Sequence, residues 1–316
     1  MSDEIIEQTF QVTEPARLKL SNIRGSVEIQ AGEPGVIWVK ASKHNGSKPT
    51  TIEMSQAEDG SVVVETREPE GSWHLFNFSS PAKVDYQVRV PPSCRLRVSC
   101  VSSSMSISGV SGEFSFSTVS GDIGLHSLTG PLKINTVSGD VSGSHLSGEL
   151  SLETVSGDIR FDDSDFAGVR GSTVSGNLFL HTALGAGPYK LSSVSGDVHF
   201  MVPEDTACTA EVHGVSGTFT STLPISAQTR HGGGRTAQVQ GGGVQIKLNS
   251  VSGDLWIGKP GDEPGTGHSE AAAPAEHAHH ADHAYHVPPV PPAPPTPPRP
   301  PVPPAPVEEK LTTAEL

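Results

Sequence analysis

A three-residue signature, Val-Ser-Gly, returns along most of this chain of 316 residues and constrains its fold more than any other feature. Successive intervals from Val119 to Val215 are 18, 18, 19, 20 and 21 residues. Repeats of this length are typical of solenoids, in which repeats stack because none can cover its apolar side alone. The signature begins at Val110, Val119, Val137, Val155, Val174, Val194, Val215 and Val251, with a degenerate copy at Val101.

Between the signatures, apolar and polar residues alternate. In one copy this alternation predicts that Val119, Gly121, Ile123 and Leu125 share a face. A period of two predicts strands with one buried face, and each Ser-Gly pair permits a sharp bend. We therefore expect an all-β fold, a parallel β-solenoid of 18–21-residue coils with the signature valines stacked in its core. An antiparallel meander with a hairpin turn at each Ser-Gly pair is the rival interpretation.

The chain divides into three parts. Residues 1–95 lack the signature but contain short strand-like runs, which predict a β-rich N-terminal cap or first coils. Residues 96–260 form the repeat solenoid; the interval of 36 residues from Val215 to Val251 corresponds to two periods with a worn middle copy. Residues 261–316 hold 15 of the 27 prolines and predict a disordered His- and Pro-rich tail.

The sequence resembles a known family along residues 5–260. The segments that carry the resemblance are Phe10, Leu18-Lys-Leu, Gly25-Ser-Val-Glu-Ile, Val88-Arg-Val-Pro-Pro and the Thr-Val-Ser-Gly-Asp-Ile copies. They are similar to the bacterial putative-adhesin family of β-strand-repeat proteins of unknown function. The resemblance implies a β-helical domain of bacterial proteins, often linked to the cell envelope or to envelope stress, with no established enzyme activity.

Composition narrows the classes of partner. The formal net charge of −14 disfavours binding to nucleic acid, because phosphate backbones repel an acidic chain. Three cysteines are too few, and odd in number, for a disulfide framework. The first residues, Met1-Ser-Asp-Glu-Ile-Ile-Glu-Gln, lack the basic and apolar regions of a signal peptide, and no run approaches 18 apolar residues. We expect a reduced, cytoplasmic protein without a direct membrane span.

An acidic residue follows the Ser-Gly pair in most copies. If the coils stack in register, these carboxylates line one edge of the molecule. Two roles are open: a row of calcium sites, or hydrogen bonds from each carboxylate to the backbone amides of its own turn. The residues of this predicted turn ladder are Asp122, Asp140, Asp158, Asp197 and Asp254, with Asn177 in the same slot. A second, exposed ladder is predicted for Thr118, Thr136, Thr154 and Thr173.

The tail offers two candidate binding segments. Imidazoles suit zinc, copper and nickel, so the histidine cluster predicts weak binding of a divalent metal. Its candidate ligands are His277, His279, His280 and His283. Residues 288–306 predict a stiff polyproline II arm, within which Pro294–Arg299 fits the P-x-x-P-x-R form that aromatic grooves bind.

Patterns for catalysis are weak, and we expect neither an enzyme nor a bound cofactor. Asp162, Asp163 and Asp165 in one widened corner are the best candidates for a polysaccharide-acting site. The sequence favours a non-enzymatic interaction or scaffold module, a rigid solenoid with a disordered arm that binds a protein partner. The alternative is self-association of end coils into filaments.

Overall fold

The computed structural model describes residues 3–44, 50–68, 81–231 and 233–262, all within one compact unit, Met1–Ala271. These ranges contain 22 strands and no helix, which confirms the predicted all-β class. Consequently no described segment forms a helix able to cross a bilayer. The predicted tail, with its histidine and proline segments, lies outside the described residues from position 263 onward.

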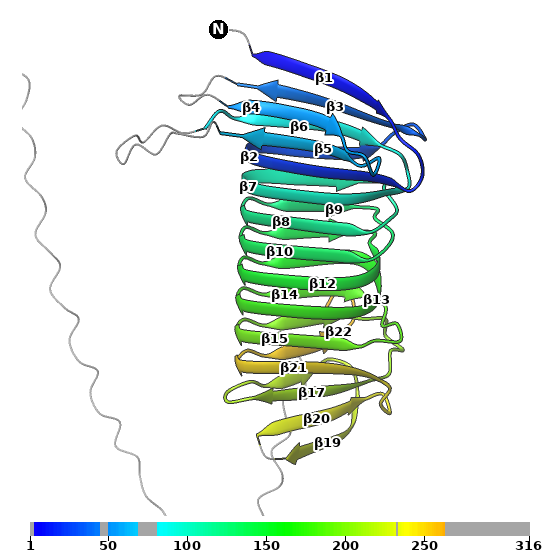
Figure 1. Ribbon diagram of the computed structural model, residues 1–316. Helices are drawn as coiled ribbons and strands as arrows, with labels where there is room; N and C mark the ends of the chain where they lie inside the picture. Colours follow the sequence, from blue (N-terminus) through cyan, green and yellow to red (C-terminus); the bar gives the residue numbers. More distant parts are fainter. Residues whose placement is uncertain (1–2, 45–49, 69–80, 232, 263–316) are drawn as a thin grey trace, which may run out of the picture. The chain divides into compact units, whose positions relative to one another are not determined.

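The centre of this unit is a stack of parallel coils, each with a long and a short strand (Figure 1). β8 pairs in parallel with β10, so that Phe114 lies beside Leu132, 18 residues further along. This pairing fits the predicted solenoid and shows that the rival meander is wrong for these coils. The long strands are β8 (Phe114–Ser120), β10 (Leu132–Ser138), β12 (Ser147–Ser156) and β15 (Tyr189–Ser195). The short ones are β9 (Ile123–His126), β11 (Val141–Ser144), β14 (Leu178–Thr182) and β16 (Val198–Met201), and β7 (Cys94–Ser108) and β13 (Ile159–Ser175) run through a corner.

The parallel stack begins earlier than the first signature. β2 (Ala16–Ala31) pairs in parallel with β7 over its whole length, from Ala16 beside Cys94 to Gln30 beside Ser108. On its other edge β2 pairs in parallel with β5 (Val62–Arg67) and β6 (Val84–Val90). Antiparallel strands then cover this end: β3 (Val36–Lys43) on β6, β1 (Glu4–Gln11) on β3, and β4 (Thr51–Gln56) on β5.

At the opposite end, the order of the coils in space differs from their order in the chain. β21 (Val244–Ser252) pairs in parallel with β15 on one side and with β17 (Cys208–Gly214) on the other. Likewise, β22 (Leu255–Gly258) lies between β16 and β18 (Phe219–Ser221). The last signature coil is therefore inserted between two earlier ones. The intervening residues form β19 (Ile225–His231) and β20 (Gly234–Val239), an antiparallel pair in which β20 also pairs with β17. The prediction that this interval contains a degenerate copy of the repeat is therefore wrong.

The core consists of stacked side chains from both strands of each coil. In β8 the buried residues are Phe114, Phe116 and Thr118, whereas in β9 they are Ile123 and Leu125. The buried positions are thus even before the corner and odd after it, because the corner changes the phase of the alternation. Counting through the corner placed the signature valines inside. The structure buries Val110 but places the other signature valines outside, so the prediction is wrong for all of them except Val110.

Candidate functional site

Seven signature valines form a continuous row on the outside of the stack, which we call the valine ridge. The coils bring together Val101, Val119, Val137, Val155, Val174, Val194 and Val251, each between 47% and 53% exposed. At a strand spacing of ~4.8 Å the row is about 29 Å long. Val215 extends it at the end of the stack and is 89% exposed. Single exposed valines are ordinary on a protein surface, but a contiguous apolar row marks a candidate interaction surface.

A shallow groove of about 530 Å³ runs beside the central part of the valine ridge. Its walls come from three successive long strands, β8, β10 and β12. Val119, Val137 and Val155 form the apolar wall, and Ser117, Asn135 and Glu153 lie two residues earlier on the same outer face. The groove is therefore apolar on one side, polar on the other, and parallel to the ridge.

Three of the four threonines of the predicted second ladder are buried, not exposed as predicted, and Thr173 is half-buried. Thr118, Thr136 and Thr154 are at most 6% exposed and point into the corner. Cys100 occupies the same register position as Thr118 on the neighbouring strand. The hydroxyl groups of Thr118 and Thr136 have no hydrogen-bond partner among the described residues. The predicted second binding ladder is thus a structural column inside the corner, which we call the threonine column.

The predicted acidic ladder exists, but its hydrogen bonds run between coils. The Asp122 carboxylate accepts a hydrogen bond from the Asp140 amide at 3.0 Å, and Asp140 accepts one from the Asp158 amide at 2.9 Å. The same contact continues through Asn177, Asp197 and Asp254 and ends at the amide of Thr218. Each carboxylate therefore accepts a hydrogen bond from a backbone amide of the neighbouring coil, and not from the amides of its own turn. We call Asp122, Asp140, Asp158, Asp197 and Asp254 the carboxylate column.

Nothing in this arrangement resembles a cation site. No group of three or more His, Cys, Asp or Glu side chains in the described ranges is placed to hold a metal ion. The candidate ligands His277, His279, His280 and His283 lie outside those ranges, so zinc binding by the tail stays a prediction.

The widened corner holds its carboxylates in surface ion pairs. Asp162 contacts the Arg160 guanidinium at 3.0 Å, and Asp163 contacts His181 Nδ1 at 3.2 Å. The side chains of Asp162 and Asp163 are 43% and 63% exposed, and Asp165 is also exposed. Glycosidases need carboxyl groups that converge on a substrate in a shielded cleft. These exposed ion pairs give the polysaccharide-acting interpretation no support.

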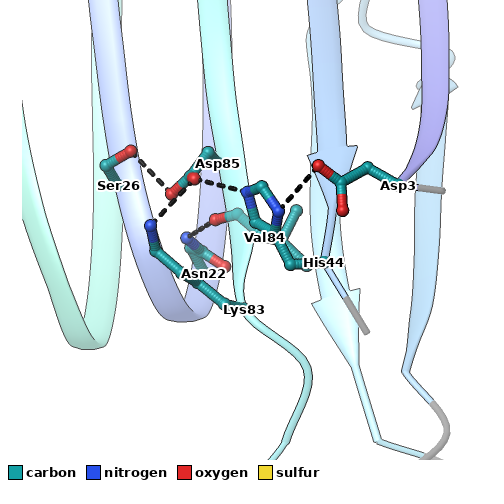
Figure 2. Close-up of polar contacts among 7 residues, drawn as sticks. All are labelled: Asp3, Asn22, Ser26, His44, Lys83, Val84 and Asp85. Atoms are coloured by element: carbon teal, nitrogen blue, oxygen red, sulfur yellow. Dashed lines mark hydrogen bonds and ion pairs between the residues drawn. The ribbon is translucent and has the colours of Figure 1, made fainter. Parts of the chain in front are cut away.

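A cluster of charged side chains lies where the segment before β1, the end of β3 and the start of β6 meet (Figure 2). His44 bridges two carboxylates, with Nε2 2.8 Å from Asp85 and Nδ1 3.0 Å from Asp3. Asp85 also accepts hydrogen bonds from the Ser26 hydroxyl at 2.8 Å and from Lys83 Nζ at 3.0 Å. Because Ser26 donates to Asp85 and not to His44, the cluster lacks the nucleophile–base pair of a hydrolase.

Proton equilibria in this cluster follow from its contacts. The hydrogen bond with Asp85 raises the pKa of His44 above 6.5, and that with Asp3 adds to the effect. Burial alone would raise the pKa of Asp85, but hydrogen bonds from Ser26, Lys83 and His44 outweigh it and lower that pKa below 3.8. The cluster is thus an ion network that ties the segment before β1 to β3 and β6.

The three cysteines are buried and unpaired. Burial raises the pKa of Cys94 and Cys100 to about 12 and that of Cys208 to about 11. A nucleophilic or metal-binding cysteine requires the thiolate, so these thiols are structural side chains.

The fold and its outer surface define an all-β repeat protein whose most distinctive exposed feature is an apolar ridge. A family model described as Toastrack DUF4097 matches residues 16–257, and the chain belongs to this family. The matched segment begins with β2 and ends in β22, so it coincides with the parallel stack. No functionally curated protein matches the chain.

Several solved structures are similar to the chain over most of its length. A putative adhesin from Bacteroides fragilis is 11% identical, with a TM-score of 0.45, and covers 80% of this chain and 97% of its own. A putative adhesin from Parabacteroides distasonis is 9% identical, with a TM-score of 0.41, and covers 81% and 97%. A putative lipid binding protein from the same organism is 12% identical, with a TM-score of 0.35, and covers 82% and 96%. The predicted family resemblance is confirmed by the family model.

The ridge was not predicted, although the alternation of residues in the sequence contains a signal for it. The alternation that buries Phe114 and Phe116 continues to Thr118 and leaves Val119 on the outer face. Counting forward from the preceding strand, instead of backward from Ile123 across the corner, identifies the exposed valines.

Proposed function

We propose that this protein is a non-enzymatic binding module that holds a protein partner against the valine ridge and its groove. The observation that carries the proposal is the uniform, half-exposed state of seven valines in one register. Full burial of a valine side chain stabilises by roughly 1.5–3 kcal/mol. Because each ridge valine is about half exposed, about half of this free energy would be gained when a partner covers it. Covering the whole row would supply several kcal/mol toward association.

The regular spacing of the coils makes the ridge a rigid surface of fixed geometry, which suits binding of one partner. Its valines are separated by a constant coil spacing, and inter-coil backbone hydrogen bonds fix their positions. A rigid surface loses little conformational entropy on binding, which favours affinity for a given contact area. The groove beside the ridge adds polar groups that fix the orientation of the partner.

The test replaces the central ridge with an isosteric polar side chain. Val119→Thr, Val137→Thr and Val155→Thr are combined, and tagged wild-type and variant proteins are compared by quantitative affinity purification from the native cells. Ile5→Thr, at an exposed position on β1, is the matched control. We expect the wild type and the control to retain a partner that the triple variant loses.

Thermal unfolding accompanies the purification. We expect the melting temperature of the triple variant to change by no more than a few degrees, because half-exposed valines contribute little to the core. Unchanged capture of every wild-type partner by a folded triple variant would remove the proposal. A collapse of the melting temperature would instead assign the ridge to the core.

A further inference from the structure

An uninterrupted register places six cations of this acidic protein in one column on the long-strand face. Cross-strand pairing aligns Lys19 with Arg97, then Ser115, Lys133, Ser151, Arg170, Lys190 and Lys247. We call Lys19, Arg97, Lys133, Arg170, Lys190 and Lys247 the cation column. Five of its side chains are exposed and Lys247 is half-buried. Like charges one coil apart repel, so the column has an electrostatic cost that a partner can relieve.

Few carboxylates neutralise the cation column within the protein. In the described ranges, only Arg170 and Lys247 have a carboxylate within 4 Å, Glu149 at 3.9 Å and Glu211 at 3.7 Å. Both distances are long, and the Arg170–Glu149 pair is exposed, so these pairs contribute little. Arg97, Lys133 and Lys190 are therefore available to an external anion.

The cation column lies at a fixed place relative to the valine ridge. On β10, Lys133 is followed by Asn135 at the groove, by Val137 on the ridge and, past the corner, by Asp140 of the carboxylate column. β15 gives the same sequence of features, with Lys190, Ser192, Val194 and Asp197. The stack thus carries four parallel strips: cations, the polar groove, the apolar ridge and, past the corner, carboxylates.

The order of these strips on one copy is complementary to the order on a second copy related by a two-fold rotation. A two-fold rotation about an axis parallel to the stack places the ridge of each copy in the groove of the other. The same rotation places each cation column opposite the other copy's carboxylate column. Residues of the same coil then face each other, so that Lys133 of one copy lies opposite Asp140 of the second. An isologous interface of this kind is the commonest way in which soluble proteins form dimers.

The spacing of the coils also selects this partner. Ridge, groove and charged columns all repeat at the strand spacing of ~4.8 Å, which a second copy reproduces over the full length of the ridge. An anionic bilayer also attracts cations and accepts apolar side chains. However, the carboxylate column lies directly beyond the ridge and would repel such a surface. Charge complementarity therefore favours a second copy of this chain.

We propose that two copies of this chain associate side by side with parallel stacks, ridge in groove and cation column against carboxylate column. The proposal rests on the proposed function, since it names a second copy as the partner of the same surface. It adds a role for the charged columns, which a generic apolar contact does not require.

The test is sedimentation equilibrium of the full chain and of two sets of substitutions. The first set, Lys133→Glu with Lys190→Glu, reverses two cations. The second set, Asp140→Asn, Asp158→Asn and Asp197→Asn, removes three carboxylates but keeps an oxygen that accepts the inter-coil hydrogen bond, as Asn177 does. The control, Lys40→Glu with Lys259→Glu, makes the same change in net charge outside the cation column.

We expect the wild type and the control to form dimers whose dissociation constant rises with salt. The glutamate set should raise that constant about tenfold, and the asparagine set should raise it less. Added to the glutamate set, the asparagine set should lower the constant, because it removes the new repulsion between like charges. This reversal of sign requires that the two columns face each other.

Three results would overturn the proposal. The first is a wild type that sediments as a monomer at all concentrations up to the limit of solubility. The second is an asparagine set that weakens the dimer equally in both backgrounds. The third is a monomer that binds phosphatidylglycerol vesicles through Lys133 and Lys190, which would assign the face to an anionic surface. None of these results removes the proposed function unless the valine-to-threonine triple variant also keeps its partners.

Discussion

At the scale of single residues, the glycine of each signature fixes how closely two coils approach. Gly139 has a φ of +131°, and a Cβ atom at this position would lie 2.4 Å from the carbonyl oxygen of Gly121. Gly157 meets Gly139 in the same way, at 2.3 Å. No other residue type combines this backbone conformation with this approach, so the glycine repeat is a packing requirement of the stack.

The Gly139→Ala substitution tests this requirement. We expect it to lower the free energy of unfolding by roughly 2–5 kcal/mol, through backbone strain and a clash with Gly121. Gly60→Ala is the matched control, because Gly60 has a φ of +77° and a Cβ atom added there would have nothing within 4 Å. Urea unfolding of both variants measures the difference. Equal losses for the two would show that strain alone, without the inter-coil contact, explains the glycine.

Substitutions in the carboxylate column separate the contribution of the hydrogen bond to stability from that of the carboxylate charge. Asp140→Asn keeps an oxygen for the amide of Asp158, as Asn177 does for Asp197, and should leave the free energy of unfolding of the monomer nearly unchanged. Asp140→Ala removes the acceptor and should cost about 1 kcal/mol. Chemical denaturation at low protein concentration compares them. If the asparagine variant is as unstable as the alanine variant, the carboxylate charge stabilises the corner and the hydrogen bond does not.

The ridge illustrates what residue patterns can and cannot predict. Alternation correctly identifies the strands on both sides of the corner at Gly121. It does not predict how many residues the corner uses, and one residue decides which face a side chain occupies. The phase of Val119 follows from Phe114 and Phe116 on its own strand, whereas the phase of Ile123 depends on the corner geometry, in which Gly121 has a φ of +141°. Strand positions are read from local sequence, whereas the three-dimensional turn shows which of the two flanking strands sets the phase of the ridge valines.

At the scale of elements, the His44 network controls how firmly β1 and its neighbours hold together. Because the pKa of His44 is raised above 6.5, its stabilising contribution is complete below pH 6.5 and is lost as the pH rises through the raised value. Because the pKa of Asp85 is lowered below 3.8, its contribution is present above pH 3.8 and is lost as the pH falls through the lowered value. The network is strongest between these limits.

Hydrogen exchange of β1 and β3 should follow this window. We expect greatest protection, after correction for the intrinsic exchange rate, between about pH 4 and 6.5 and declining protection toward pH 8. Asp3, Asp85 and Lys83 are the charged groups that contact the network around His44. In the His44→Gln variant the decline above pH 6.5 should disappear. A pH dependence that survives this substitution would assign it to another group.

The inserted coil gives a second prediction about elements. β21 has paired neighbours on both sides, β15 and β17, whereas β19 pairs only with β20 among the described strands. We expect amide protection to follow the order in space, so that β21 exchanges as slowly as β10 and β19 exchanges first. Leu248→Ala in β21 should cost roughly 2–5 kcal/mol, as in a mid-stack position, since Leu248 is fully buried. Exchange of β21 before β17 would contradict the insertion.

For the whole molecule, the period of the signature was sufficient to predict the class of fold. An interval of 18 residues leaves room for two strands and two corners, and its repetition favours parallel stacking over an antiparallel meander. The insertion of β21 and β22 was not predictable, because the 36-residue interval from Val215 to Val251 is equally compatible with a lost copy. Chain order does not encode which coil edges finally meet, since the same ladder of backbone groups is offered by every coil.

The interaction surface was only partly predictable for the same reason. The carboxylate column follows from one repeated position in the sequence, and inter-coil hydrogen bonds align its residues along the stack. The cation column has no repeated slot in the sequence, because Ser115 and Ser151 interrupt it and Lys19 and Lys247 come from the irregular ends. Only the register of the whole stack brings these residues together.

The central claim, that the valines of the ridge face outward and form an interaction surface, is tested most directly by cysteine accessibility. Val137→Cys and Thr136→Cys place thiols on adjacent residues of β10, and Cys100 shows that the threonine column accepts a cysteine. The native cysteines are buried and should not react with the maleimide. At a concentration where the protein sediments as a monomer, the Val137→Cys thiol should react with a maleimide nearly as fast as in the unfolded chain. The Thr136→Cys thiol should react at least about a hundredfold more slowly. Faster labelling at position 136 than at position 137 would place the valines in the core and contradict the account.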